Sequence, residues 1–431
     1  MKSLLWVVVA LFAAAFAHAQ SSAEVNAGVS YNFGSPGARS LATGGAFLGI
    51  ADDATAAYTN PAGLLSISRP QVAAEGRGWS FTNIYSDRGH VFGDPSREGF
   101  DDTAGIEEGR HTRRVANLSF ASIVYPQRRF SLAVYRHELA RFRASSTTSG
   151  IFLDRPPDEN RFFPSRSSLD LRVVSYGASV AVKVNDSLNV GLTVARQQMR
   201  LDSTTERYRW RDLHEPPSYT DLVNVQEQHG DDEAYAFNAG LLWAIDRRFN
   251  LGLVYRQGSS FKVGVSSASP GATDVTTFPG RFHVPRVIGA GLAYRPSTDG
   301  LTVISLDLNH IGYSELTDGF VPLLGERNLY RVDDALEVRL GYERYVLPDA
   351  QRFAHSKFPI ILRVGAWREP DHRLQFDDPR DPQAVLFRPG KAHYHASGGF
   401  GVALGSNYEL DVGYDYSRVQ RVLSLSMATS F

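Results

Sequence analysis

The sequence predicts an all-β protein, a transmembrane antiparallel β-barrel of about 14 strands with an N-terminal plug in its lumen. Three observations predict this fold class. Segments of about 10 to 15 residues alternate apolar and polar side chains, as strands do between lipid and a wet lumen. Short and long connections alternate between these segments. A compact segment rich in glycine and alanine precedes them, and no later stretch is like it.

The N-terminus has the features of a secretory signal peptide. Lys2 is followed by an apolar run from Leu4 to Phe16 and by Ala17-His18-Ala19, a cleavage site of small residues. The run is shorter than the roughly 20 residues that a spanning helix needs. We therefore expect three parts: a signal peptide (1–19), an N-terminal hatch or plug (20–68) and an outer-membrane barrel (69–431).

Composition excludes several classes of function. The chain has no cysteine, which excludes a disulfide scaffold and thiolate catalysis. Its 45 basic and 46 acidic residues nearly cancel, so no nucleic-acid partner is expected. Only five of the basic residues are lysines. Genome composition is the preferred explanation of the arginine excess, and the alternative is that arginines in outer loops bind lipopolysaccharide phosphates.

The alternation predicts the wall strands. Tyr235, Phe237 and Trp243 share one face of a strand, with Asn238 and Gly240 on the other. The same reading predicts strands at 70–84, 112–125, 129–143, 169–184, 187–201, 233–245, 248–264, 283–295, 300–314, 334–346, 358–369, 392–405, 407–417 and 420–431.

The connections indicate which end of the barrel faces the periplasm. Short turns are periplasmic and long loops are extracellular in such barrels. The predicted long loops are 85–111, 144–168, 202–232, 265–282, 315–333 and 370–391. Two connections depart from the rule, namely a long turn at 347–357 and a tight outer turn near Arg418. The C-terminal Phe431 closes an alternating strand, which resembles a recognition signal for barrel-assembly machinery.

Charged residues on the polar strand faces are expected to point into the lumen, because a carboxylate facing hydrocarbon is costly. We expect them to pair with one another and with the plug, and an ion path is the alternative. These residues are Asp307, Glu337, Arg339, Glu343, Arg363, Glu409 and Asp411.

The stretch from Gly37 to Leu65 is the candidate plug. It reads GARSLATGGAFLGIADDATAAYTNPAGLL and ends in a helix-stopping turn. Its signature residues are Gly44, Gly45, Asp52, Asp53, Asn60, Pro61 and Gly63. The stretch resembles the hatch of the FadL/TodX family of outer-membrane transporters for hydrophobic compounds. The resemblance implies a barrel of fourteen strands that this segment blocks, with long-chain fatty acids or aromatic hydrocarbons leaving sideways through a gap in the wall.

Metal sites and catalytic motifs are not predicted. Asp52 and Asp53 lack the surrounding oxygen ligands of a calcium site, so they are expected to cap the turn from Ala54 to Tyr58 or to pair with a lumen arginine. His393 and His395 share a strand face without a third zinc ligand. No G-x-S-x-G or H-E-x-x-H motif occurs. No cofactor is expected, although a lipase site assembled from distant strands stays open.

The predicted function is passive uptake of hydrophobic small molecules across the bacterial outer membrane by a monomer that contacts outer-membrane lipid and lipopolysaccharide. Phe47, Leu48, Ile50 and Leu64 are the candidate apolar part of the path, unless they only pack the plug. The polar segment 202–232 argues against fatty acids as the substrate. The alternative function is a barrel subunit of a protein secretion system that binds cargo proteins.

Overall fold

The computed structural model describes residues 31, 33–90, 105–155, 158–162, 164–209, 218–271, 275–297, 299–317, 330–346, 358–376, 378 and 390–431. The predicted signal peptide lies outside these residues, as do the tips of several predicted loops. The tight outer turn near Arg418 lies within them.

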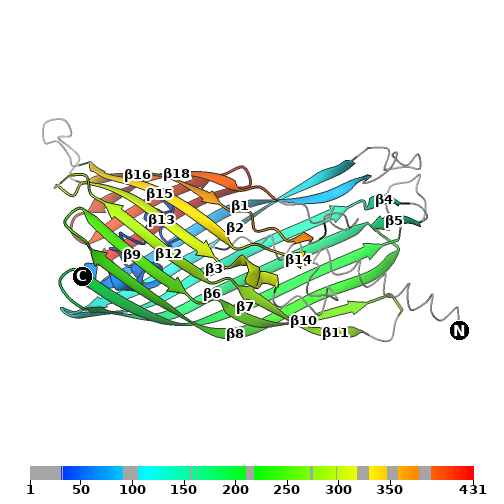
Figure 1. The fold of residues 1–431 in the computed structure, drawn as a ribbon, viewed down its shortest axis with the longest axis horizontal. Helices are drawn as coiled ribbons and strands as arrows, with labels where there is room; N and C mark the ends of the chain where they lie inside the picture. Colours follow the sequence, from blue (N-terminus) through cyan, green and yellow to red (C-terminus); the bar gives the residue numbers. More distant parts are fainter. Residues whose placement is uncertain are drawn as a thin grey trace.

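The wall is a closed antiparallel barrel of 14 strands, which confirms the predicted fold class (Figure 1). It closes where the first strand pairs with the last, with Gln71 opposite Ser430. Around the wall the strands are β1 (Gln71–His90), β2 (Gly105–Pro126), β3 (Phe130–Thr148), β6 (Ser165–Lys183), β7 (Leu188–Tyr208), β8 (Leu222–Ala244), β9 (Phe249–Arg256) in line with β10 (Ser259–Ala268), β11 (Thr276–Val284) in line with β12 (Val287–Tyr294), β13 (Thr302–Ile311), β15 (Ala335–Val346), β16 (Ile360–Glu369), β18 (His393–Leu404), β19 (Tyr408–Tyr416) and β20 (Gln420–Ser430).

Each predicted strand corresponds to one of these wall positions, but two are interrupted. The predicted strand 248–264 is broken between β9 and β10, and 283–295 is entered from β11 across a second break. Pro285 lies at the second break and has no N–H to donate to a ladder. Both halves still pair with their neighbours, because β9 and β10 each bond to β8.

Four predicted loops are wrong over most of the residues that the structure describes in them. The described parts of 85–111, 144–168, 202–232 and 265–282 largely continue the strands beyond the apolar band, and the β7–β8 ladder runs out to Tyr208 opposite Leu222. Arg200 and Asp202 point outward there, so the lipid-type alternation stops while the backbone ladder continues. The polar composition of these segments therefore reflects an outer face in water.

Smaller elements complete the outer end of the barrel. The hairpin of β4 (Ile151–Arg155) and β5 (Asp158–Phe162) lies between β3 and β6 in the chain. A separate pair joins β14 (Tyr330–Arg331) to β17 (Gln375–Phe376), near the short 3-10 helix η2 (Tyr313–Thr317).

The alternation between lipid and lumen faces is confirmed on β8. Tyr235, Phe237 and Trp243 are exposed by 73%, 49% and 42%, whereas Asn238 between them is buried. The outer face of the barrel is therefore apolar over this height, as a wall in contact with hydrocarbon requires. Among the described residues, no helix has both the length and the apolar composition needed to cross a membrane.

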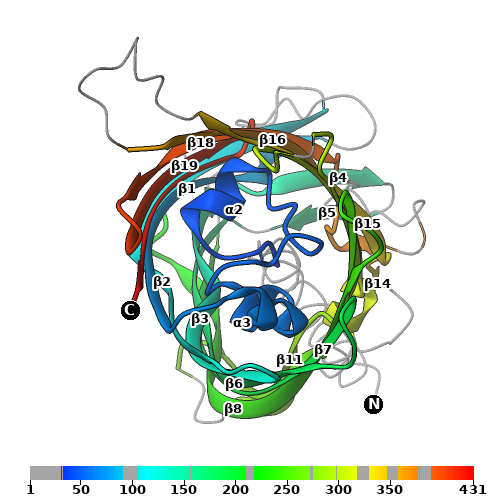
Figure 2. The same cartoon turned by 90° about the vertical axis from the view of Figure 1, so that its left-hand side faces the viewer.

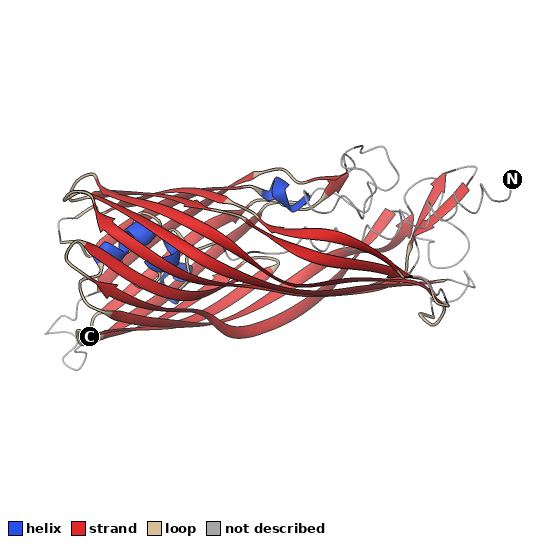
Figure 3. Ribbon diagram, turned by 90° about the horizontal axis from the view of Figure 1, so that it is seen from below, coloured by secondary structure: helices blue, strands red, loops and turns tan. Residues whose placement is uncertain are grey.

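Residues 33–68 lie inside the barrel and form a plug, which we define by this range (Figures 2 and 3). It contains the helix α2 (Ala38–Ala42), the helix α3 (Ala56–Thr59) and the 3-10 helix η1 (Pro61–Ser66). Helix α2 lies against β18 and β19, whereas η1 lies against β6, β7 and β8. The plug thus contacts opposite sides of the wall.

Candidate functional site

The turn at Asn60 and Pro61 fixes one side of the plug to the wall. The Asn60 side chain donates from Nδ2 to the carbonyls of Leu48 and Leu241, at 3.0 and 3.1 Å. Its Oδ1 accepts from the N–H of Ala62, which caps η1, and Pro61 occupies the first turn where no N–H is needed. One amide thereby joins two parts of the plug to β8.

Glycines on the wall allow the plug backbone to approach closely. A Cβ added at Gly240 would overlap Asn60 Oδ1, and one at Gly365 would overlap the backbone of Gly44. Gly44 itself has a φ of 66° and Gly45 a φ of 77°, the left-handed region that favours glycine. The close fit therefore depends on glycines in the plug and in the wall.

An ion-pair network holds the other side of the plug. Arg39 of α2 donates from Nε and Nη2 to the two carboxylate oxygens of Glu343 on β15, each at 2.8 Å. Its Nη1 lies 2.7 Å from Asp52 and 3.4 Å from Asp53. Glu343 also pairs with Arg363 at 2.6 Å. All of these groups except Asp52 and Asp53 are buried.

Arg363 extends the network along the wall. Its Nη1 lies 2.5 Å from Asp411 and its Nη2 lies 3.1 Å from Glu409. Four of the seven predicted lumen charges, counting Arg363 and Glu343, thus form one cluster. The arginine that meets Asp52 and Asp53 belongs to the plug itself, not to the wall.

Asp53 also caps the turn that follows it. Its Oδ1 accepts from the backbone N–H and from the hydroxyl of Thr55, at 2.9 and 2.5 Å. Burial raises the pKa of the Asp53 carboxyl, while the Arg39 guanidinium opposes that rise. Both roles weighed for this aspartate in the sequence are present together.

Of the remaining predicted lumen charges, Asp307 and Arg339 bind the plug backbone, and Glu337 pairs with Arg339. Asp307 Oδ2 on β13 accepts from the N–H groups of Phe47 and Leu48, at 2.7 and 3.0 Å. Arg339 on β15 donates to the Gly44 carbonyl at 2.9 Å and pairs with Glu337 at 2.6 Å. These contacts satisfy plug backbone groups that water does not reach.

The apolar plug residues lie between plug and wall. Phe47 and Ile50 pack with Ala293 and Val303, whereas Leu64 belongs to a larger cluster. Gly63 lies under Ala51, where a Cβ would overlap the Ala51 carbonyl. Leu48, like the other three, is almost fully buried. Their part in a substrate path stays a prediction.

His395 occupies a buried polar site on β18. Its Nδ1 lies 2.7 Å from Asp415 and its Nε2 lies 3.2 Å from Glu369, while the Trp367 ring stacks on it with centroids 3.8 Å apart. His393 is half-buried and pairs with Glu369 in the β16–β18 ladder. In the part of the chain that the structure describes, no three ligating side chains are grouped as a metal site.

The wall has a break in its hydrogen-bonding between β2 and β3. Their ladder runs from Pro126 opposite Ser131 and ends at Phe120 opposite His137. Beyond that point β2 pairs with β1 out to Ile106, and β3 pairs with β6 out to Thr148. A bulge between Glu138 and Ala140 bends β3 at this height. In Figure 1 the outer parts of β1 and β2 diverge from the rest of the wall.

An indole on β1 lies behind this opening. Trp79 Nε1 donates to the carbonyl of Arg141 at 3.1 Å, so it satisfies a backbone group of β3 on the side where β2 is not paired. Phe81 on β1 meets Phe142 on β3 edge to face, with centroids 5.7 Å apart. Aromatic side chains therefore line the lumen side of the opening.

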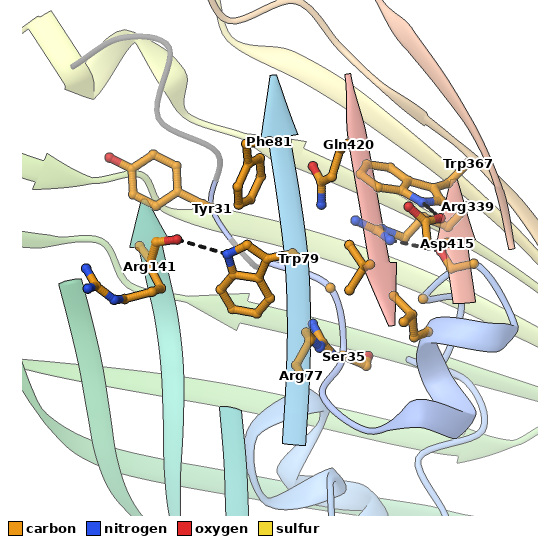
Figure 4. Close-up of a pocket in the computed structure, with 16 residues that line it drawn as sticks. Tyr31, Ser35, Arg77, Trp79, Phe81, Arg141, Arg339, Trp367, Asp415 and Gln420 are labelled. Carbon is orange, nitrogen blue, oxygen red and sulfur yellow. Dashed lines mark hydrogen bonds between the residues drawn. The ribbon is translucent and has the colours of Figure 1, made fainter. Parts of the chain in front are cut away.

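A pocket connects the plug with this opening (Figure 4). Its floor is formed by plug residues, and one side is formed by Ala140 and Arg141 of β3. Four aromatic side chains and several paired charges complete it. The lining residues are Tyr31, Gly34, Ser35, Leu41, Gly44, Gly45, Arg77, Trp79, Phe81, Ala140, Arg141, Arg339, Trp367, Asp415, Gln420 and Val422.

Of the predicted site residues, Gly44, Gly45 and Arg339 line this pocket. The sequence reasoning missed Trp79, Phe81 and Trp367, and it missed Arg39 as the partner of the aspartates. The available signal was the pair Trp79 and Phe81 on the lumen face of a strand, where polar residues were expected.

Comparisons with known proteins agree with this architecture. A family model described as outer membrane protein transport protein (OMPP1/FadL/TodX) matches residues 147–315. No curated protein sequence matches significantly.

Several solved structures have the same fold. A FadL homologue from Pseudomonas aeruginosa is 14% identical, with a TM-score of 0.60 over 91% of this chain and 98% of that one. The toluene transporter TodX from Pseudomonas putida is 13% identical, with a TM-score of 0.54 over 92% and 98%. The toluene transporter TbuX from Ralstonia pickettii is 12% identical, with a TM-score of 0.54 over 93% and 99%. The protein is an integral β-barrel of the Gram-negative outer membrane, it shares the fold of the solved FadL and TodX structures, and its residues 147–315 resemble the OMPP1/FadL/TodX family of transport proteins.

Proposed function

We propose that this barrel admits hydrophobic small molecules by passive diffusion through the pocket and out between β2 and β3, with no chemical step. The observation that carries the proposal is that Ala140 and Arg141 line the pocket at the height where β3 has no ladder to β2. Between a molecule in the pocket and the membrane, the junction of β2 and β3 thus has no backbone hydrogen bonds at this height.

The lining favours aromatic compounds over long acyl chains. Tyr31, Trp79, Phe81 and Trp367 offer ring faces and edges, which pair well with a planar aromatic molecule. The guanidinium of Arg339 lies 4.1 Å from the Trp367 ring centroid and is neutralised by Glu337. The structural neighbours named above include two toluene transporters, and a further one is described as a monoaromatic hydrocarbon channel.

The seated plug supports a sideways exit. Its polar bonds to β8, β13 and β15 would all have to break before a molecule passed along the barrel axis. Leaving toward the lipid requires movement of the Trp79, Phe81 and Phe142 side chains and loss of the bond from Trp79 to the Arg141 carbonyl, but no strand ladder has to break. We therefore place the exit in the wall and not through the plug.

The test has two separate parts. A disulfide bond fixes the plug to the wall, and a larger side chain fills the pocket. The chain has no natural cysteine, so the pair Ala42→Cys/Gly399→Cys can form a single disulfide between plug and wall. A Cβ on Gly399 would lie 2.8 Å from that of Ala42, within about 1 Å of disulfide geometry, but it would also overlap the Val412 carbonyl oxygen. The change in gel mobility on boiling therefore first verifies that the double-cysteine protein forms a folded barrel. Uptake of labelled toluene is then measured in Gram-negative cells without their own channel of this kind.

The locked protein should transport as well when oxidised as when reduced. Ala140→Trp should lower uptake at least about tenfold, because it fills the pocket beside the opening. The matched control is Ala178→Trp on the outward face of β6, which should leave uptake unchanged. Loss of uptake on oxidation would favour the axial route, and normal uptake by Ala140→Trp would refute the pocket as the path.

A further inference from the structure

Arginines at the outer edge of the apolar band differ between two sides of the barrel. On β3, β6 and β7 they lie beside carboxylates of the wall. Arg172 Nε is 3.1 Å from Glu138, and Arg196 Nε is 2.7 Å from Glu233. Arg136 also lies within 3.5 Å of Glu138. The positive charge on this side is largely neutralised within the protein.

The neighbouring part of the wall, from β16 through β20 to β2, carries four arginines that form no ion pair with any described residue. They are Arg368 at the outer end of β16, Arg418 in the turn after β19, Arg421 at the start of β20 and Arg114 on β2. Arg368 donates to the Leu336 carbonyl at 3.3 Å, and Arg421 lies 5.5 Å from the Tyr416 ring centroid. We call these four residues the arginine row.

The strand register places the members of the arginine row close together. Tyr416 pairs with Arg421, Arg421 with Ser80, and Ser80 with Arg114. Neighbouring strands lie about 4.8 Å apart, so the Cα atoms of Arg421 and Arg114 are separated by about 10 Å across the short Ser80 side chain. Arg368 on β16 pairs with Tyr394 on β18, and β18 is two strands away from β20. The labelled strands β16, β18, β19 and β1 lie on one side of the barrel (Figure 2), and β20 pairs with β19 on one edge and with β1 on the other.

Directly below the arginine row, the same strands present apolar side chains to the membrane. Leu423 and Leu425 on β20 are exposed by 49% and 55%, and Leu118 on β2 by 49%. Phe400 and Tyr414 continue this surface on β18 and β19. An amphiphile bound here would lay its acyl chains on the apolar residues and bring its head group to the guanidinium groups.

We propose that the arginine row binds the phosphate groups of lipid A, the membrane anchor of lipopolysaccharide in the outer leaflet. Guanidinium groups bind phosphate through two parallel hydrogen bonds, and such charge-assisted bonds are strongest where water is partly excluded. Four cations without a counter-ion among the described residues, at the head-group level, match a lipid that carries phosphates and several acyl chains. This inference is independent of the transported substrate and of its exit.

The test uses purified protein in detergent with diphosphoryl lipid A as the probe, and native mass spectrometry measures the dissociation constant. Replacing the arginine row by Arg114→Gln, Arg368→Gln, Arg418→Gln and Arg421→Gln should weaken binding at least about tenfold. The matched control is Arg172→Gln with Arg196→Gln. It should change binding less than about twofold, because the guanidinium groups of these two arginines are already paired with carboxylates of the protein. Lipid A without phosphates should bind all three proteins equally and more weakly.

Slower gel mobility after boiling verifies that each variant forms a folded barrel. If the fourfold variant does not fold, Arg114→Gln with Arg421→Gln replaces it, and the phosphate dependence is measured on the unchanged protein. The proposal is overturned if the arginine-row variant binds diphosphoryl lipid A as tightly as the unchanged protein. It is equally overturned if phosphate removal leaves binding unchanged, or if the control variant loses as much affinity.

Discussion

Arg39 and Glu343, which lie 304 positions apart in the sequence, face each other as a buried pair with two parallel hydrogen bonds of 2.8 Å. Glu343 also accepts from Arg363, so a single carboxylate joins the plug to the wall and two guanidinium groups to each other. Removing this carboxylate takes a shared partner from both guanidinium groups, although Arg39 keeps Asp52 and Asp53 and Arg363 keeps Asp411 and Glu409. Because the lost bonds are buried and charge-assisted, the loss is larger than that of a surface pair.

Glu343→Gln should loosen the plug. Two buried guanidinium groups lose the charge of their shared partner but keep their other carboxylates, so we expect a cost of about 1.5 to 3 kcal/mol. Conductance in planar bilayers should rise, and the temperature at which gel mobility changes should fall. Glu233→Gln is the matched control, because its pair with Arg196 is exposed and should contribute at most about 1 kcal/mol. Equal conductance and equal transition temperatures of the two variants would contradict the role of Glu343 in holding the plug against the wall.

Asn60→Asp should disturb the plug more than Asn60→Ala. The aspartate places an acceptor where Nδ2 now donates to the Leu48 and Leu241 carbonyls, and it repels both. Alanine only removes these bonds, at a cost of about 1 to 3 kcal/mol for the carbonyls left unpaired. Limited proteolysis of the folded barrel reports exposure of the plug. Faster cleavage of the Asn60→Ala variant than of the Asn60→Asp variant would refute this prediction.

Gly240→Ala should displace the turn at Asn60, because the added methyl group would overlap the Asn60 side chain. Gly78→Ala on β1 is the control, since its Cβ would meet Ala116 at an ordinary 3.8 Å. We expect higher ion conductance from Gly240→Ala alone. Closed channels in both variants would mean that the turn tolerates the methyl group without moving.

Ligand binding in the pocket should quench the fluorescence of Trp79 and Trp367, which both line it. Titration with p-nitrotoluene should therefore quench less in Trp79→Phe and in Trp367→Phe than in the unchanged protein. Trp243 faces the membrane on β8, so Trp243→Phe should raise the quenched fraction of the remaining signal. An unchanged quenched fraction in both pocket variants would place the ligand elsewhere.

The sequence predicted the fold well because the relevant signal is local. Alternation with a period of two follows from lipid on one side and a wet lumen on the other, so a strand such as 233–245 is readable without knowledge of its neighbours. The segment from Gly37 to Leu65 could be distinguished from the wall strands for the same reason, since its small residues do not follow the period of two. The inward carboxylates on 407–417 follow from the cost of a charge in hydrocarbon.

The sequence underestimated the length of the strands above the membrane. Once the outward residues meet water, as at Arg200 and Asp202, polar side chains occupy both faces and the pattern reads as a loop. The backbone ladder nevertheless continues, because its hydrogen bonds do not depend on which solvent the side chains meet.

Tertiary structure alone decided the partners and the opening. Pairing of Arg39 with Glu343, and of Asp307 with the amides of Phe47 and Leu48, depends on which wall positions the plug reaches after closure. The end of the β2–β3 ladder at Phe120 and His137 depends likewise on the bulge in β3 and on the course of β1 and β2. Alternation determines which face of a strand meets lipid, whereas hydrogen bonds between distant segments determine where the wall is joined and where it is open.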